Sequence, residues 1–304
     1  MYKVSVIIPT HNRGNDIKKS IYSVINQTFR PYEIIIVSDG STDNTKQVVS
    51  KIQEEYNNIY FYEYFPNMGA NHARNYGINK SNGNIIAFLD DDDEWLENKL
   101  EKQINCFTQN QSIGLVYTGV YNIYLDDNIT YISLPKHYKD IRKEILFHNI
   151  ISTTSTVCVK KDVLLKVGAF DENLPALQDY DLWIRICQKY YIYGIQEPLI
   201  NYYNKRKTRN QISSNTENYF KAIEYISKKY DKLLSKLSSS EICKREINNA
   251  NLLMNKEMRN NNKRKAFKYA ITIMKINKRL SNIVYIIMSL LPYKLILKVR
   301  ALKK

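Results

Sequence analysis

The sequence predicts an α/β fold in which a mostly parallel central sheet is flanked by helices. Short apolar, β-branched runs at Lys3–Pro9, Glu33–Val37 and Ile85–Leu89 are typical of strands buried on both faces of such a sheet. Segments with apolar residues at helical spacing lie between the runs, as in successive β-α-β units. Each run ends in polar residues, and ligands of open α/β sheets bind beyond the carboxyl ends of the strands. A functional site is therefore expected at that edge.

The first β-α-β unit begins with the strand Lys3–Pro9, which is closed by its proline. The polar loop Thr10–Asp16 follows, and Asp16 is the expected N-cap of the first helix. The apolar residues that indicate this helix are Ile17, Ile21, Val24 and Ile25.

The second unit begins with the strand Glu33–Val37, which runs into the polar segment Ser38–Asp43. Ser41 or Thr42 is the expected cap of the following helix. The apolar residues of that helix are Val48, Val49 and Ile52.

A third strand is expected at Ile59–Tyr62, followed by a turn at Asn67–Asn71 and a helix that runs through Ala73–Asn75 towards Ile78. The strand Ile85–Leu89 comes next. Polar clusters at Thr10–Arg13, Asp39–Asp43 and Asp90–Asp93 consequently end three neighbouring strands, and we expect them to converge.

The segment Asp90–Asp93 places four carboxylates directly after a buried strand. Such acidic runs are most often solvated faces. Because adjacent carboxylates repel one another, and because this run leaves a buried strand, we favour a metal–phosphate site. Hard cations such as Mg²⁺ and Mn²⁺ prefer oxygen ligands of this kind.

Glycine motifs that cradle phosphates are absent. No G-x-G-x-x-G follows the first strand, and no glycine-rich run ends in Gly-Lys-Ser/Thr. A nucleotide bound here needs its phosphates neutralised in another way, and a metal ion on Asp90–Asp92 would do so.

Composition narrows the functional class. The 304-residue chain has 45 Lys and Arg against 30 Asp and Glu, a formal net charge of +15, which favours an anionic partner. Its four cysteines are scattered without a C-x-x-C pair, so neither structural zinc nor a disulfide framework is expected. The sequence near Met1 has no apolar core of a signal peptide, and no apolar stretch reaches the ~20 residues of a membrane-spanning helix. The protein is therefore expected in the cytoplasm, either free or peripheral on the inner face of the membrane.

Several motifs in order resemble those of the family 2 inverting glycosyltransferases of GT-A fold. The matching segments are Ile8–Arg13, Ser23–Thr28, Ile36–Thr45, Asn67–Gly69, Ala73–Asn75, Phe88–Asp93, Lys160–Glu172 and Gln178–Arg185. The resemblance covers roughly the first two thirds of the chain and does not extend beyond about Ser213.

The resemblance implies a nucleotide-sugar site. Pro9, Thr10 and Asn12 would line the base pocket, Asp39 would hydrogen-bond the base, and Arg74 would help to place the nucleotide. Uridine is the base that the resemblance favours. Ser38 stands where many members carry an aspartate, whereas the following aspartate is present.

The resemblance also assigns the acidic run. Asp91 would lie near the ribose, Asp92 would ligate a Mn²⁺ or Mg²⁺ ion that bridges the two phosphates, and Asp90 would complete the D-x-D pattern.

Asp179 is the implied catalytic base, with Asp181 as the alternative, because Gln178 replaces a common glutamate before the base. Without the family pattern, Asp179 could equally be a helix N-cap. The Gln/Arg-x-x-Arg-Trp signature of processive members is absent, which favours transfer of one sugar per encounter.

Acceptor contacts are less sharply indicated. Ser152–Thr156 could bind hydroxyl groups or form a polar strand edge, and Tyr117, Tyr121 and Tyr124 could form a platform for a sugar ring. The basic run Lys205–Arg209 could lie near the diphosphate or in solvent.

Beyond Asn215 the composition shifts to Lys, Asn, Ile and Leu, and amphipathic helices are expected at Phe220–Leu237, Glu241–Met258 and Lys263–Ile276. The basic amphipathic tail Ile283–Leu302 suits an anionic membrane surface, or else packs on the catalytic domain or a second subunit. We therefore expect a GT-A catalytic domain over 1–214, with a nucleotide-sugar half at about 1–95 and an acceptor half at about 96–214. Residues 215–304 would form a helical extension.

These observations predict an inverting, metal-dependent, non-processive glycosyltransferase. It would move one sugar from a nucleotide-diphosphate sugar, with UDP favoured, to a glycan or polyprenyl-linked acceptor in surface polysaccharide synthesis. The alternatives are a non-catalytic module that binds nucleotide sugars or anionic surfaces, and a nucleotidyltransferase. Nucleic acid is not an expected partner, because the basic residues concentrate in a tail with an Ile/Leu face. A homo-oligomer is compatible with the same tail.

Overall fold

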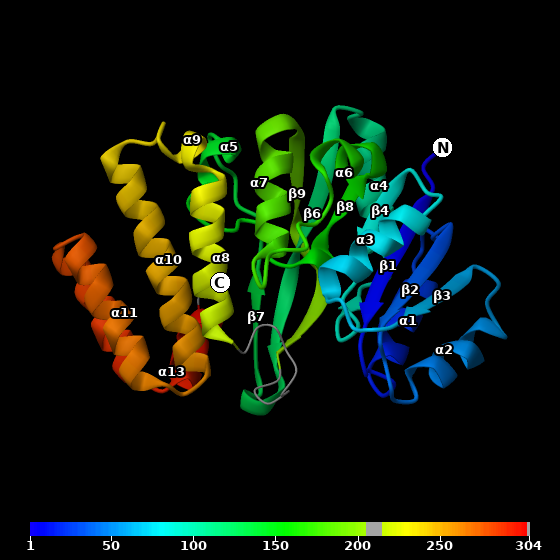
Figure 1. Ribbon diagram of the computed structural model, residues 1–304, viewed down its shortest axis with the longest axis horizontal. Coiled ribbons are helices and arrows are strands. Elements are labelled where there is room, and N and C mark those ends of the chain that lie inside the picture. The colour runs from blue at the N-terminus through cyan, green and yellow to red at the C-terminus, as the bar shows by residue number, and fades with distance from the viewer. Residues whose placement is uncertain (205–214, 303–304) are drawn as a thin grey trace.

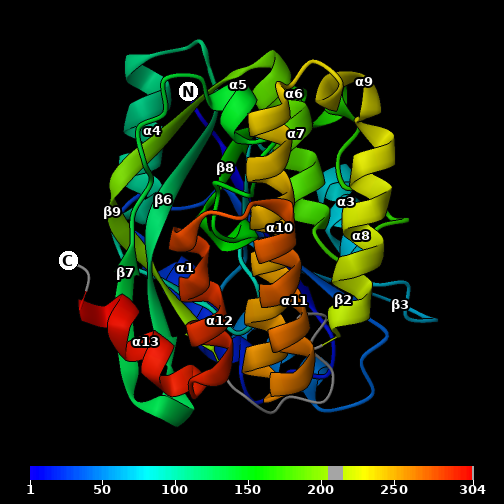
Figure 2. The ribbon, with the colours of Figure 1, turned by 90° about the vertical axis from the view of Figure 1, so that its left-hand side faces the viewer.

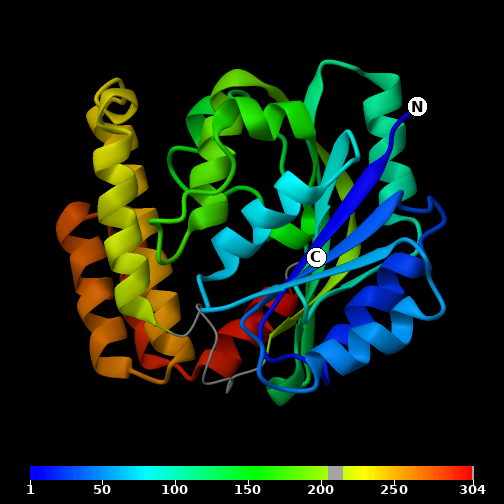
Figure 3. The ribbon, with the colours of Figure 1, turned by 45° about the vertical axis from the view of Figure 1, so that its right-hand side comes forward.

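A computed structural model describes residues 1–204 and 215–302. In this part of the chain a nine-stranded sheet has the order β3-β2-β1-β4-β8-β6-β9-β5, with β7 paired to β6. Helices cover both faces of the curled sheet, and a group of C-terminal helices stands against one end of it (Figures 1 and 3).

The first half of the sheet is parallel, as predicted. Its strands are β1 (Val4–Thr10), β2 (Glu33–Asp39), β3 (Ile59–Tyr64) and β4 (Ile85–Phe88). β1 pairs in parallel with β2 and β4, and β2 pairs in parallel with β3. In this register Thr10 lies beside Ser38, so the polar ends of the strands meet at one edge.

The second half of the sheet is mixed. β8 (Cys158–Lys160) runs antiparallel to both β4 and β6 (Ile113–Tyr124), while β6 runs parallel to β9 (Tyr191–Asn204). β5 (Glu94–Trp95) and β7 (Ile129–Ser133) add antiparallel edges. The parallel arrangement therefore holds where the nucleotide half was expected.

Alternate residues of the central strands face two separate hydrophobic cores. Ile8 belongs to the core beneath α1 (Ile17–Ile25), α2 (Thr45–Gln53) and α4 (Lys99–Gln109). Ile7 belongs to the opposite core, together with Trp183. The helices on that face are α3 (Ala70–Lys80), α5 (Ile141–Glu144), α6 (Lys161–Val167) and α7 (Gln178–Lys189). Burial on both faces explains why the strands are apolar throughout.

One of the two expected helix caps is wrong. Asp16 is the N-cap residue of α1, as predicted, although its side chain accepts no capping hydrogen bond. Neither Ser41 nor Thr42 caps α2, whose N-cap residue is Asn44. α2 begins at Thr45, and its first turn is held by Asp43, whose Oδ1 accepts from the Thr45 backbone nitrogen at 3.0 Å. The hydroxyl of Ser41 instead accepts from the backbone nitrogen of Asn12, which ties the two loops together.

The C-terminal region is helical, as predicted. It contains α8 (Thr216–Lys229), α9 (Asp231–Leu234), α10 (Ser239–Arg259), α11 (Lys263–Ile276), α12 (Ile283–Leu290) and α13 (Tyr293–Leu302). Ala222 and Ile226 of α8 are buried in the same core as Trp183 of α7. The tail is two helices separated by Pro292, and α13 lies beside β7 with Tyr293 against Tyr124 (Figure 2). Among the described residues, no helix combines the length and the apolar character needed to cross a bilayer.

Candidate active site

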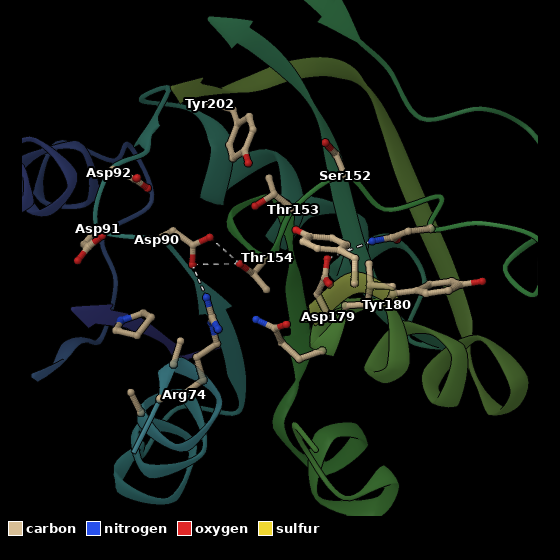
Figure 4. Close-up of a pocket in the computed structure, with 18 of the residues that line it drawn as sticks. Arg74, Asp90, Asp91, Asp92, Ser152, Thr153, Thr154, Asp179, Tyr180 and Tyr202 are labelled. Atoms are coloured by element: carbon tan, nitrogen blue, oxygen red, sulfur yellow. Dashed lines mark hydrogen bonds and ion pairs between the residues drawn. The ribbon is translucent and has the colours of Figure 1, made fainter. Parts of the chain in front are cut away.

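A cavity of about 990 Å³ opens at the edge where β1, β2 and β4 end. One wall comes from the loops after those strands, a second from the segment 148–154 and the start of α7, and a third from α8 and α10. Figure 4 shows the first two walls facing each other, with Arg74 and the acidic run opposite Asp179. The polar clusters that the sequence placed after the strands therefore do converge.

Asp39 organises the floor of the cavity. It is 3% exposed, and its two carboxylate oxygens accept hydrogen bonds from the backbone nitrogens of Met68, at 2.7 Å, and Gly69, at 2.8 Å. Its backbone oxygen accepts from Asn67 Nδ2 at 2.9 Å. Each carboxylate oxygen has a second lone pair, so Asp39 can still accept a hydrogen bond from a ligand.

The loop after β1 is held in shape by Asn12. This residue has a left-handed backbone with φ 53°, a conformation that asparagine tolerates better than most residues. Its Oδ1 accepts from the Thr42 backbone nitrogen at 2.7 Å. Pro9 and Thr10 line the cavity beside it. All three residues predicted for the base pocket are thus together at the cavity wall.

Asp90 is fixed by two partners. Its Oδ1 accepts from Arg74 Nη2 at 2.6 Å, and Thr154 Oγ1 donates to its carboxylate at 3.0–3.1 Å (Figure 4). Arg74 is 6% exposed, and its Nε and Nη1 have no hydrogen-bond partner among the described residues. Since buried guanidinium donors are normally satisfied, these two groups are available to a bound anion.

Asp91 and Asp92 share the guanidinium of Arg13. Arg13 Nε lies 3.7 Å from Asp91 Oδ1, and Nη2 lies 3.8 Å from Asp92 Oδ2. Burial, followed by the charge of Asp92, raises the pKa of Asp91 to about 7. The acidic run is therefore partly neutralised by Arg13 and Arg74.

A metal ion bound at the acidic run would need oxygen ligands there. In the described residues, no group of three or more Asp, Glu, His or Cys side chains is arranged as a metal site. Asp92 nevertheless lines the cavity with a carboxylate. Mg²⁺ is commonly held by one or two carboxylates plus substrate phosphates, so the oxygen donor of Asp92 fits such a cation.

Asp93 does not line the cavity but is buried within the fold. It is fully buried, and its Oδ2 accepts from Ser155 Oγ at 2.6 Å. Burial and then the charge of Asp90 raise its pKa well above the usual value. Only the first three acids of the run reach the cavity.

Asp179 lies at the second wall, in the first turn of α7. The residue that precedes this helix as its N-cap is Leu177, so the capping alternative for Asp179 is wrong. The Oδ2 of Asp179 accepts from Asn149 Nδ2 at 3.0 Å. Burial raises the pKa of this carboxyl group, partly offset by the nearby charge of Arg74. A carboxylate in this setting is a stronger base than one in water.

Asp181, the alternative base, points away from the cavity. It is fully buried, and it pairs with Arg185 at 2.8 Å and with Lys229 at 2.9 Å. Tyr230 also donates to its Oδ1 at 2.8 Å. Asp181 consequently fastens α8 to α7.

Some of the residues expected to contact the acceptor line the cavity, and others do not. Ser152, Thr153 and Thr154 line the cavity. Of the three tyrosines, Tyr117 and Tyr124 are buried, and Tyr124 stacks on Tyr131 instead. None of the three tyrosines lines the cavity, so the predicted aromatic platform is wrong. The basic run Lys205–Arg209 lies outside the described residues.

The sequence did not predict the third wall of the cavity. Tyr219 of α8 lines the cavity, as do five residues of α10: Asn248, Asn249, Leu252, Lys256 and Arg259. Asn249, Leu252, Lys256 and Arg259 follow one another at intervals of three or four positions, and Asn248 adjoins Asn249, so all five lie on one helix face. Their mostly polar character on an amphipathic helix was the available signal.

Several known proteins are similar to this chain in sequence. A family model described as Glycosyl transferase family 2 matches residues 5–170. An uncharacterized glycosyltransferase of Haemophilus influenzae is 30% identical over 99% of this chain and 100% of its own length. A putative teichuronic acid biosynthesis glycosyltransferase, TuaG of Bacillus subtilis, is 32% identical over 70% of this chain and 82% of its own length.

Solved structures share the fold. The S. aureus TarS structure in complex with UDP-GlcNAc has a TM-score of 0.64 at 19% identity and covers 95% of this chain and 79% of that one. The mannosyltransferase PcManGT from Pyrobaculum calidifontis, in complex with GDP-Man and Mn²⁺, has a TM-score of 0.58 at 16% identity and covers 99% and 87%.

Proposed function

The chain belongs to glycosyl transferase family 2, and we propose that it transfers one sugar per encounter, with inversion, from a UDP-sugar to a glycan or polyprenyl-linked acceptor in surface polysaccharide synthesis. It is a glycosyltransferase of GT-A fold. The observation that carries the proposal is that one cavity joins the acidic strand end to the base candidate Asp179.

The donor would bind at the wall formed by the parallel strands. Asp39, buried at the cavity floor, would accept a hydrogen bond from the base, and Pro9, Thr10 and Asn12 would enclose it. The unpartnered Nε and Nη1 of Arg74 would bind an oxygen of the nucleotide, with Asp91 nearer the ribose. Structures of similar fold contain UDP-GlcNAc and GDP-Man, which supports a nucleotide-sugar donor.

A Mn²⁺ or Mg²⁺ ion would be held by Asp92, with Asp90 nearby. Such an ion offsets the negative charge that develops on the departing nucleoside diphosphate. The Mn²⁺ in a structure of similar fold supports a divalent cation. In this chain Arg74 and Thr154 fix the position of Asp90, which holds the acidic run against the sheet.

Asp179 would act as the general base. Its carboxylate would take the proton of the acceptor hydroxyl while the hydroxyl oxygen bonds to the anomeric carbon. The bond from that carbon to the diphosphate oxygen breaks in the same step, which inverts the configuration. Asn149 orients the carboxylate through its 3.0 Å hydrogen bond. The raised pKa of Asp179 favours proton transfer.

Calorimetric titration with UDP tests the donor site. Wild-type protein should bind UDP more tightly with Mn²⁺ than without it, and Asp92→Ala should lose the metal-dependent part. Asp162→Ala is the matched control, because Asp162 is an exposed aspartate on α6 that forms an ion pair with Lys166 on the surface. If UDP, GDP and CDP all fail to bind with or without metal, the proposed function is wrong.

The C-terminal tail would contact the inner face of the cell membrane. Exposed apolar residues gather on α12 and α13: Ile283, Val284, Ile287, Leu290, Leu295 and Val299. Lys294 and Lys298 are exposed on α13 among them. Apolar residues next to cations suit an interface with anionic lipid, where a polyprenyl-linked acceptor would be presented.

A further inference from the structure

The third wall of the cavity is basic, whereas the strand end in the first wall is acidic. Lys256 and Arg259 of α10 lie one helical turn apart on the face that lines the cavity. Tyr219 of α8 lies beside them. These residues lie beyond the segment 5–170 matched by the family model, so that match does not account for the wall.

Lys256 is a half-buried cation that donates a hydrogen bond to a neutral tyrosine hydroxyl. Its Nζ donates to Tyr219 Oη at 2.9 Å and lies 4.1 Å from the centre of the Tyr219 ring. Within residues 1–204 and 215–302, no ion pair joins Lys256 to a carboxylate. Burial, and then the charge of Arg259, lowers the pKa of Lys256 to about 8, while Asp179 acts in the opposite direction. The ammonium group is therefore still largely protonated at neutral pH.

The position of α10 assigns this cation to the acceptor side. The same helix face continues to Asn248, whose Nδ2 donates to the backbone oxygen of Phe147 at 3.3 Å. Phe147 is two residues from Asn149, which orients Asp179. The donor side has cations of its own, because Arg13 and Arg74 lie beside the acidic run.

We infer that Lys256, together with Tyr219 and Arg259, recognises an oxyanion on the acceptor glycan, either a carboxylate or a phosphate group. The inference rests on the proposed function, since it names the substrate class of the same cavity. A half-buried ammonium and a guanidinium at one wall favour an anionic group over a neutral hydroxyl.

Paired probes test this inference by ligand-observed NMR on the UDP-bound protein. Methyl glucuronide and methyl glucoside differ only in a carboxylate, and glycerol 3-phosphate and glycerol differ only in a phosphate. The wild type should bind at least one charged member more tightly than its neutral partner. Lys256→Met should weaken that binding about ten- to hundredfold, the range expected for loss of a charge-assisted hydrogen bond.

Three further variants sharpen the result. Lys256→Arg should retain the preference for the charged probe, and Tyr219→Phe should weaken it less than Lys256→Met does. Lys268→Met, at an exposed position of α11, is the matched control and should change nothing. If circular dichroism shows that Lys256→Met is unfolded, the binding of the paired probes to Tyr219→Phe and Lys256→Arg tests the inference.

Two outcomes would overturn the inference. One is equal binding, or no binding, of the charged and neutral probes by wild type. The other is a Lys256→Met protein that binds the charged probes normally but has lost affinity for UDP, which would assign Lys256 to the donor diphosphate. Failure of wild type to bind UDP would contradict the proposed function instead.

Discussion

At the scale of single residues, two aspartates two positions apart have opposite roles. Because an α-helix has 3.6 residues per turn, Asp179 and Asp181 point to nearly opposite sides of α7. Asp179 faces the cavity with a hydrogen bond from Asn149. Asp181 faces inward, where Arg185 and Lys229 neutralise it. A sequence motif places both acids in one segment, but only the rotation of the helix distinguishes them.

Asp179→Asn should abolish turnover while leaving the donor site intact. Loss of a general base costs about 10²–10⁴ in rate, whereas the UDP affinity measured by calorimetry should stay within about twofold of wild type. Wild-type turnover should fall as the pH decreases through the raised pKa of Asp179, since the base must be ionised. Asp162→Asn is the control. Normal turnover in Asp179→Asn would remove this residue from catalysis.

Lys99→Met should stabilise the protein at neutral pH. Lys99 is fully buried in α4, with its ammonium group 3.7 Å from the centre of the Trp95 ring, and burial lowers its pKa from 10.5 to about 8. Between pH 8 and 10.5 the unfolded state binds more protons, so wild-type stability should rise with pH across this window.

The neutral methionine avoids burying a charge, and its advantage should be about 1–3 kcal/mol at pH 7 and shrink towards pH 10. Urea unfolding at both pH values measures this difference. Lys51→Met, at an exposed site on α2, should show no such trend. A variant less stable than wild type at both pH values would mean that the contact with Trp95 outweighs the cost of burial.

At the scale of elements, the local sequence pattern predicted the positions of the strands well but only some of the cavity walls. β1, β2 and β4 begin and end within a residue or two of the expected limits, because burial on both faces leaves an unbroken apolar run. The acidic run and Asp39 could be placed from strand order alone. The face of α10 could not, since nothing in a helix's own sequence states which cavity that face will line.

Ile226→Ala tests whether α8 is part of the catalytic core. Ile226 is 1% exposed and belongs to the same buried cluster as Trp183. Truncation of a buried isoleucine costs about 2–5 kcal/mol of unfolding free energy. Ile242→Ala, at a 39% exposed position on α10, should cost much less. Equal small losses in both variants would instead support residues 215–304 as a separate extension, as the sequence suggested.

At the scale of the whole molecule, the C-terminal helices have two different surfaces. α8 and α10 face the cavity, whereas α12 and the outer side of α13 expose apolar residues next to lysines. Figure 2 shows α13 across the lower part of β7, with α12 next to it. The molecule could therefore touch a membrane with its tail while α10 remains at the cavity.

Ile287→Ser should weaken binding to vesicles of anionic phospholipid. Ile287 is 54% exposed, and the loss of its apolar contact with lipid should reduce retention in a sedimentation assay several-fold. Leu165→Ser, at a 57% exposed position on α6, is the matched control. Wild type should also be released by salt, because Lys294 and Lys298 supply electrostatic attraction. If wild type does not bind vesicles but self-associates, and if Ile287→Ser no longer self-associates, the apolar face contacts a second subunit instead.

The two sides of the cavity are encoded far apart in the gene. The wall from the parallel strands comes from residues 9–92, while the wall from α8 and α10 comes from residues 219–259. Recombination or drift in the last third of the gene could thus change which acceptor is used without altering the donor pocket. Ala222 and Ile226 limit this freedom, because any replacement helix must fill the same volume against Trp183. New acceptor preferences in this lineage should accordingly arise by substitution on the cavity face of α10 before exchange of whole helices.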